Sequence, residues 1–297
     1  MRELKILRLR VPKMKNGRKR EVRFMDALER YDRMARRASR QVIGTYSTSF
    51  GLSVALLPQA MRRDIANLYA VVRVADEIVD GAAPACASRL LDAYEEQICA
   101  APGMRFHTDP IVHAYAATAR RCGFKEEHLR AFFASMRADL TPRAYSPAEL
   151  AQYIYGSAEV IGLLCLAIFF ADEPMSCDRE HLETGARHLG AGFQKANFLR
   201  DLRDDTERLG REYYPATVTV EEKAGIVASI RKDFAIAEPT VRLLPRGARV
   251  AVTAAYGIYS RLTEQLDAMT PEELLARRAS VPTWEKAAIV ARAVARG

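Results

Sequence analysis

The sequence has few of the residues on which small stapled or metal-organised domains depend. Five cysteines lie scattered among 297 residues and form no CxxC pair, so a disulfide framework and a structural zinc site are both disfavoured. Reduced thiols instead indicate a cytoplasmic protein. The longest apolar run, residues 160–171, has twelve residues. A membrane-spanning helix needs about 20, so this run predicts a core helix.

Signals for β-strands and for a dinucleotide site are also missing. Alternating β-branched residues are nearly absent, and Ala, Leu, Arg and Glu dominate, which favours helices. The segment "LGAG" at 189–192 lacks the GxGxxG spacing and follows no predicted strand, so its glycines are expected to serve a helix crossing. Neither a repeat nor a low-complexity linker divides residues 25–297. We therefore expect one all-α domain.

Periodicity and capping signals predict ten helices, at 26–43, 60–80, 86–100, 110–122, 126–139, 147–171, 179–208, 220–236, 239–268 and 283–296. Ser146, with Glu149 three residues later, has the pattern of a capping box, and "TPEEL" at 270–274 repeats it. In such a box the first side chain and the glutamate each bond the other's backbone N–H.

The basic charge is confined to one end of the chain. Residues 1–24 hold ten Lys or Arg and two acidic residues, which accounts for the whole net charge of +8. Such a run predicts a solvated, disordered extension. Binding of this extension to anionic lipid or nucleic acid, and translation starting at Met25, are the alternatives. The neutral remainder gives no reason to expect nucleic acid as a partner. The extension lacks the apolar run of a signal peptide.

Two acidic segments lie in apolar surroundings about 120 residues apart. Asp76 and Asp80 are spaced i, i+4, and Asn197, Asp201 and Asp205 continue the same spacing over two turns. On a helix, residues four apart share one face. Carboxylates in apolar settings are strongly disfavoured unless they are paired or bind a metal. Each segment therefore predicts a stripe of oxygen ligands along a helix.

Two facing stripes of this kind would suit Mg²⁺, which accepts a few carboxylates and keeps positions for water or phosphate. Arginines adjoin both segments: Arg73, Arg200 and Arg203. Guanidinium groups bind phosphate oxygens in pairs, so a diphosphate is the expected ligand. A solvated acidic face remains the alternative, because a single DxxxD is common on exposed helices. Removing one carboxylate of a buried cage should relieve repulsion between like charges.

Several segments together resemble the squalene/phytoene synthase family, in that family's order over about residues 40–296. They are "YSTSF" at 46, "LYAVVRVADEIVD" at 68, "YIYGSAEVIGLLCL" at 153, "LGAGFQKANFLRDLRDD" at 189, "GREYYP" at 210 and "SVPTWEKAAIVARAVAR" at 280. The residue patterns of the middle segments are most similar to those of bacterial phytoene synthases. The resemblance implies an all-α isoprenoid-synthase fold with a central cavity.

The family's roles carry over position by position as expectations. Metal binding is implied for Asp76, Asp80, Asp139, Asn197, Asp201 and Asp205. Substrate binding is implied for Ser47, Ser49, Phe50, Arg73, Gln194, Arg200 and Arg211. Tyr153 and Tyr155 match aromatics near the reacting carbons. Two positions depart from the family pattern: Tyr46 stands where many members have His, and Glu159 where a Gly is usual.

The resemblance implies head-to-head condensation of two geranylgeranyl diphosphates to phytoene, with Mg²⁺ or Mn²⁺ and without NADPH. Condensation of farnesyl diphosphate to squalene or dehydrosqualene is the nearest alternative, and a non-catalytic helical scaffold is the alternative of another class. Head-to-tail elongation is disfavoured because no DDxxD repeat occurs. An apolar product implies peripheral contact with a membrane surface. The oligomeric state is not predicted.

Overall fold

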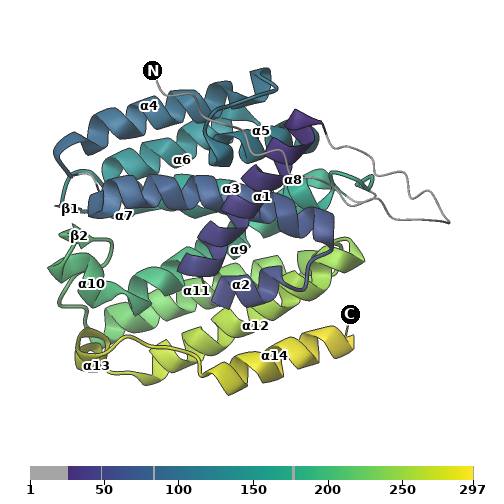
Figure 1. Ribbon diagram of the computed structural model, residues 1–297. Helices are drawn as coiled ribbons and strands as arrows, with labels where there is room; N and C mark the ends of the chain where they lie inside the picture. The colour runs from purple at the N-terminus through teal and green to yellow at the C-terminus, as the bar shows by residue number, and fades with distance from the viewer. Residues whose placement is uncertain (1–25, 48, 83, 176–177, 297) are drawn as a thin grey trace, which may run out of the picture.

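The computed structural model describes residues 26–296 except 48, 83 and 176–177, and excludes the side chains of 49, 50 and 84. The basic extension predicted at 1–24 lies outside these residues. The chain forms a layered bundle of helices (Figure 1). The helices are α1 (Ala27–Tyr46), α2 (Ser49–Val54), α3 (Gln59–Glu77), α4 (Ala87–Ala100), α5 (Pro110–Cys122), α6 (Glu126–Ala138), α7 (Pro147–Ile154), α8 (Val160–Phe169), α9 (Arg179–Arg200), α10 (Leu202–Glu207), α11 (Val220–Val241), α12 (Arg246–Ala268), α13 (Pro271–Ala276) and α14 (Thr283–Arg296). The two strands are β1 (Arg143–Ala144) and β2 (Arg211–Glu212).

The all-α class predicted from the sequence is confirmed, and several helix ends fall where the capping signals put them. The Ser146 side chain accepts a hydrogen bond from the Glu149 backbone N–H, and the Glu149 side chain accepts one from the Ser146 backbone N–H. Thr270 and Glu273 form the second predicted box, at the start of α13. These boxes satisfy backbone donors that a helix N-terminus otherwise leaves unpaired.

The predicted helices are wrong at both acidic segments. The helix expected over 60–80 ends as α3 at Glu77, and a π-helical turn, Ile78–Ala82, follows it. Gly81 in that turn has φ 114°, a conformation that glycine adopts at little cost. The helix expected over 179–208 stops at Arg200, and Asp201, with φ −100° and ψ 10°, separates α9 from α10. Both aspartate pairs therefore span a local irregularity rather than regular helix.

Other boundaries differ as well. α11 continues through Pro239 to Val241, and the helix expected at 239–268 begins only at Arg246, as α12. Pro239 has no N–H to bond the carbonyl four residues earlier, so the packing of α11 outweighs one missing backbone hydrogen bond. Another π-helical turn, Tyr155–Glu159, joins α7 to α8 within the helix predicted at 147–171. The short helix α2 and the strands β1 and β2 were not predicted.

Buried apolar side chains gather in two clusters. One lies mainly among α3 to α6 and α8, and the other mainly among α9 to α13 (Figure 1). The glycines of "LGAG" serve close helix crossings, as expected. A Cβ on Gly190 would lie 2.5 Å from the Ala158 carbonyl oxygen, and one on Gly192 would lie 2.5 Å from Phe234. These glycines let α9 approach its neighbours closely.

One segment, Pro147–Phe169, is long and apolar enough to cross a membrane by length and composition alone. Half of it is buried within the protein. Val160, Leu164 and Ile168 are each at most 1% exposed and belong to the first cluster. The segment thus serves as a core helix, as the run at 160–171 predicted.

Candidate active site

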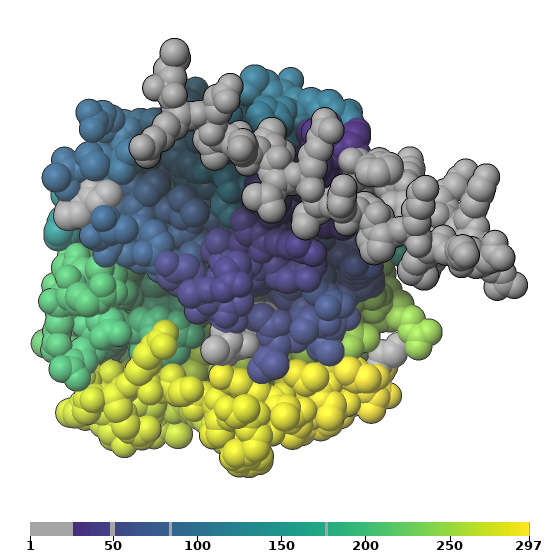
Figure 2. Space-filling model, viewed as in Figure 1, coloured from purple at the N-terminus to yellow at the C-terminus, as the bar shows by residue number. Residues whose placement is uncertain are grey.

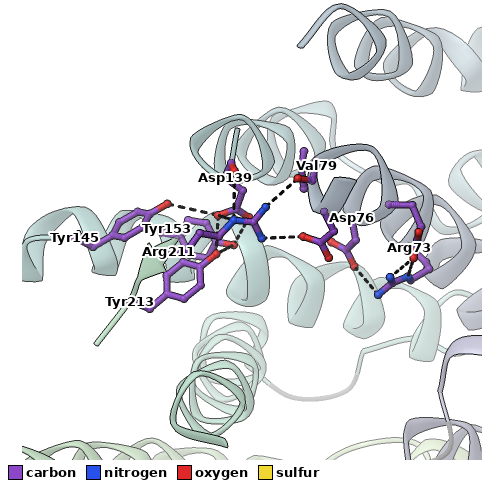
Figure 3. A network of polar contacts seen from close by, with 10 residues as sticks. Arg73, Asp76, Val79, Asp139, Tyr145, Tyr153, Arg211 and Tyr213 are labelled. Carbon is purple, nitrogen blue, oxygen red and sulfur yellow. Dashed lines mark hydrogen bonds and ion pairs between the residues drawn. The ribbon is translucent and has the colours of Figure 1, made fainter. Parts of the chain in front are cut away.

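Arg211, which follows the second acidic segment in the chain, binds the first segment. It belongs to β2, which pairs in parallel with β1 through Arg143. Its side chain is only 6% exposed. Nη1 donates to Asp80 Oδ1 at 2.8 Å, Nη2 to the Val79 carbonyl at 3.0 Å and Nε to the Asp139 carbonyl at 3.3 Å. Figure 3 shows this guanidinium between Asp139 and the turn that carries Val79. A residue that follows the second acidic segment is thus fixed against the first.

Tyrosine hydroxyls bind the Asp139 carboxylate. Tyr153 donates its hydroxyl hydrogen to Oδ2 and Tyr213 donates to Oδ1, each at 2.6 Å, and Tyr145 lies on the same side of the carboxylate (Figure 3). Burial raises the pKa of Asp139, against the opposing effect of Arg211 and the tyrosines. Both carboxylate oxygens already accept hydrogen bonds. The structure therefore places Asp139 as a support for Arg211, while the metal-binding role implied by the resemblance stays a prediction.

Asp76 and Asp205 carry charge without full compensation. Burial raises the pKa of Asp76 to about 7, and the Asp80 and Asp139 carboxylates reinforce the shift against Arg73. Burial likewise raises the pKa of Asp205 to about 7, with Asp201 and Asp139 reinforcing it. The Arg73 Nη1 atom is 3.9 Å from Asp76. The two segments thus lie within electrostatic reach of each other, since Asp80 also raises the pKa of Asp205.

Asp201 differs, because two arginines bind it. Arg200 donates from Nε at 2.9 Å and from Nη2 at 2.5 Å, and Arg278 donates from Nε at 2.5 Å. Burial alone would raise the pKa of Asp201, but the bonds from Arg200 and Arg278 outweigh it and lower that pKa. Arg278 was missed by the sequence analysis. Its only signal was its place two residues before the segment at 280 that carries the resemblance.

Arg73, which was predicted to bind diphosphate beside the first segment, contacts side chains of α3 and α1 instead. It donates to Glu77 and stacks on the Tyr46 ring at 4.4 Å. The phenol that replaces the family's usual His therefore packs against an arginine. Ser47 is the C-cap residue that follows α1, and it bonds the Tyr69 side chain. The predicted roles of the Ser49 and Phe50 side chains lie outside the described side chains.

The remaining predicted residues lie along α9 and the π-helical turn before α8. Asn197 accepts a hydrogen bond from Tyr259 at 3.2 Å, and Gln194, one turn earlier on α9, is half-buried. Arg187 lies 5.5 Å from the Tyr155 ring centroid and donates to Glu159 at 2.7 Å. The Glu159 carboxylate is therefore neutralised by a salt bridge.

Gly210 sets the entry of the chain into β2, and its replacement gives a testable prediction. Its φ is 65°, and a Cβ would lie 3.0 Å from Pro142. Gly210→Ala should destabilise the protein by about 1–2 kcal/mol, the cost of a left-handed L-residue, and should displace Arg211. Urea unfolding and turnover measure both effects.

Gly225 provides the matched control. It is exposed in the middle of α11 with open space around it, so Gly225→Ala should stabilise by about 0.5–1 kcal/mol. Equal effects of the two alanines would contradict a conformational requirement at Gly210.

The donor chemistry around Arg211 fits a hard divalent cation, although the side chains as they stand do not form a cage. Within the described part of the chain, no three His, Cys, Asp or Glu side chains come close enough to hold an ion together. Asp76 and Asp205 nevertheless present carboxylates whose pKa is raised by burial and by like charge. Oxygen ligands of this kind are those that Mg²⁺ prefers.

The comparisons with known proteins agree with this geometry. The squalene/phytoene synthase family matches residues 43–226. The chain is 28% identical to a phytoene synthase of Arthrospira platensis, over 83% of this chain and 88% of that protein. It is also 28% identical to a presqualene diphosphate synthase of Rhodopseudomonas palustris, over 61% of this chain and 62% of that protein.

Among solved structures, a dehydrosqualene synthase has the same fold, with a TM-score of 0.72 and 17% identity, covering 91% of this chain and 99% of the other. The matched residues 43–226 include both acidic segments, Asp139 and Arg211. The chain therefore belongs to the squalene/phytoene synthase family of prenyltransferases.

Proposed function

We propose that the protein is a phytoene synthase that joins two geranylgeranyl diphosphate molecules head to head. The observation that carries this proposal is that the buried guanidinium of Arg211 binds Asp80 of the first segment, while Arg211, Asp139 and Asp80 all act on the pKa of Asp205 in the second. The relatives named phytoene synthase, which match most of the chain, support the choice of substrate. The arrangement supports an active enzyme over a non-catalytic scaffold, because a scaffold has no use for half-buried carboxylates whose charge is only partly compensated.

The aspartates of the two segments, Asp76, Asp80, Asp201 and Asp205, would hold the metal. Bound there, Mg²⁺ or Mn²⁺ would supply positive charge that stabilises the departing diphosphate. Arg200 and Arg278 form charge-assisted hydrogen bonds to Asp201. Their N–H groups suit diphosphate oxygens equally well, because a guanidinium pairs with carboxylate and phosphate in the same geometry. Both arginines are proposed to release Asp201 and to bind the diphosphate of the substrate instead.

The carbon chemistry needs protection from water and a place for positive charge. The donor's C–O bond breaks and gives an allylic cation and diphosphate. The acceptor's double bond attacks this cation, and loss of a proton closes a cyclopropane in prephytoene diphosphate. Tyr259 stacks on Phe193 with 4.1 Å between ring centroids, beside Asn197. Aromatic faces of this kind attract cations.

The second half of the reaction releases the second diphosphate, rearranges the carbon skeleton and loses another proton to give phytoene. Two diphosphates and two protons leave in all, so no reductant is consumed. Squalene formation differs, since it ends with hydride transfer from a nicotinamide. Cofactor dependence therefore separates the two activities.

The proposal predicts that labelled geranylgeranyl diphosphate with Mg²⁺ gives phytoene, and that adding NADPH leaves the rate unchanged. Chromatography of the extracted products measures both. Squalene appearing from farnesyl diphosphate only when NADPH is present would overturn the assignment. Presqualene diphosphate or dehydrosqualene as the main product would favour the alternative that the Rhodopseudomonas palustris relative supports.

We further propose that the enzyme works in the cytoplasm at a membrane surface. The product is a hydrocarbon, and each CH₂ group moved into water costs about 0.8 kcal/mol. Release into lipid is therefore much easier than release into water. Vesicles or mild detergent should raise the turnover rate at saturating substrate. An unchanged rate would show that release does not limit turnover.

A further inference from the structure

A second concave site lies on the C-terminal side of the bundle. α11, α12 and α14 enclose a groove of about 890 Å³, a volume typical of ligand sites. In Figure 1, α14 runs beneath α12 to the C-terminus, and in Figure 2 it forms the lower edge of the visible face. The apolar walls include Val241, Val250, Tyr256, Ile289 and Ala293. None of the aspartates of the candidate active site lines this groove.

The groove has an excess of positive charge. Its charged lining consists of Arg242, Arg249, Arg261, Arg292 and Arg296 with Glu238, Glu264 and Glu285. Arg261 binds two of these carboxylates, Glu285 at 2.5 Å and Glu264 at 3.0 Å. Among the residues that the structure describes, the other four arginines form no salt bridge, and one carboxylate, Glu238, remains to balance them. An anion is the complementary ligand.

Arg249 supplies an independent sign of a missing partner. Its Nε–H is buried and has no hydrogen-bond acceptor among the described residues, while Nη1 bonds the Arg242 carbonyl at 3.3 Å. A buried donor without an acceptor costs about 1–3 kcal/mol. An anionic oxygen in the groove would remove that cost.

Trp284 stands at the entrance, at the start of α14. It is 71% exposed and is the one tryptophan of the chain. An exposed tryptophan beside arginines is typical of a protein surface that rests at a membrane interface, where the ring lies among the headgroups. Basic pockets at such surfaces bind anionic lipid headgroups.

We propose that this groove binds an anionic membrane phospholipid, with its phosphate at Arg249, Arg292 and Arg296 and an acyl chain along Val250 and Ile289. The apolar walls account for the chain and the unpaired arginines for the phosphate. The site would hold α14 against the bilayer. The proposal goes beyond the condensation reaction and does not depend on which prenyl diphosphate is the substrate.

Trp284 makes the test specific to the groove, because its emission is the only tryptophan signal. The full chain is titrated with vesicles of phosphatidylcholine alone and of phosphatidylcholine with phosphatidylglycerol. The anionic vesicles should shift the emission to shorter wavelength, and acyl-brominated lipid should quench it. The neutral vesicles should leave it unchanged.

In the variant Arg292→Gln/Arg296→Gln, the midpoint of the titration, which is the lipid concentration at half the full emission shift, should rise about 25-fold. Each basic residue near an anionic surface contributes about fivefold to binding. Arg37→Gln/Arg40→Gln removes the same charge from exposed positions on α1 and should leave the midpoint unchanged. Circular dichroism checks that both variants fold.

Four results would overturn the proposal. One is sedimentation with anionic vesicles without any change in Trp284 emission, which would locate binding elsewhere on the chain. Another is an equal loss in both double variants. A shift produced by inorganic phosphate alone would indicate a site for small anions. A shift that follows protein concentration without vesicles would indicate a second copy of the chain in the groove.

Discussion

Replacing Asp76 or Asp205 with asparagine is expected to abolish most turnover while making the metal-free protein more stable. Each substitution removes a charge from the proposed metal and diphosphate site, so the rate should fall by about a hundredfold to a thousandfold. Burial raises the pKa of both carboxyls to about 7. Near pH 8 the folded protein must keep two poorly compensated charges, and the amide removes one of them.

The sign of the pH effect follows from these raised pKa values. Between the unfolded value near 4 and the folded value of about 7, the folded state binds more protons than the unfolded state. The free energy of unfolding should therefore fall as the pH rises through this window. Asp76→Asn and Asp205→Asn should each flatten that fall. Urea unfolding of the metal-free variants at about pH 5 and about pH 8 measures the change in the free energy of unfolding across most of this window.

Asp80→Asn and Asp201→Asn are the contrasting pair. From the sequence, replacing Asp80 or Asp201 should relieve repulsion between like charges, but the structure gives both aspartates arginine partners. Asp80 pairs with buried Arg211, and Asp201 with Arg200 and Arg278. Their removal leaves cations unpaired, so both variants should lose turnover and stability together. Equal stability changes at all four positions would contradict this division, and full turnover by any of the variants with Mg²⁺ would contradict its place in the site.

The helices were predictable because their signals are local. α5 and α14 begin and end where periodicity put them, and the boxes at Ser146 and Thr270 mark real N-termini. The interruptions at Ile78–Ala82 and Asp201 were not predictable, because neither a π-helical turn nor a single non-helical residue between two helices has a distinct residue pattern. Strands of two residues are likewise too short to show alternation.

The site residues were found by spacing and resemblance, but two of their partners, Tyr213 and Arg278, were not. Tyr213 reaches Asp139 across 74 positions and Arg278 reaches Asp201 across 77. Such contacts depend on how distant elements pack, and a single sequence carries no pattern for them. The resemblance therefore implied the same metal-binding role for Asp139 and Asp201, whereas the structure surrounds one with tyrosines and the other with arginines.

Arg211→Gln is expected to be the most destabilising single substitution in the site. The buried guanidinium binds Asp80 and two backbone carbonyls and lies 3.7 Å from the Asp139 carboxylate. Removing one partner of a buried ion pair typically costs about 3–5 kcal/mol, because the remaining charge stays buried. Urea unfolding followed by circular dichroism measures the loss.

Arg203→Gln is the matched control. Arg203 is 52% exposed and pairs with Glu207 one turn away, so its loss should cost at most about 0.5 kcal/mol. The stability loss of Arg211→Lys should lie between those of Arg211→Gln and Arg203→Gln. A single ammonium keeps the charge but cannot reach Asp80, Val79 and Asp139 together. A lysine variant as stable as the parent would show that charge alone matters. An Arg211→Gln variant as stable as Arg203→Gln would show that the contacts of Arg211 with Asp80, Val79 and Asp139 do not stabilise the fold.

Turnover of the lysine variant then distinguishes support from direct substrate binding. If Arg211 only positions Asp80, the lysine variant should recover activity in proportion to its folded fraction. If the guanidinium also binds diphosphate, as the family resemblance implies, activity should stay low even under conditions where the variant is fully folded, because an ammonium cannot make the paired bonds to phosphate oxygens. The affinity for inorganic diphosphate, measured on the folded variant by calorimetry, should fall in parallel. Unchanged diphosphate affinity would limit Arg211 to its structural contacts.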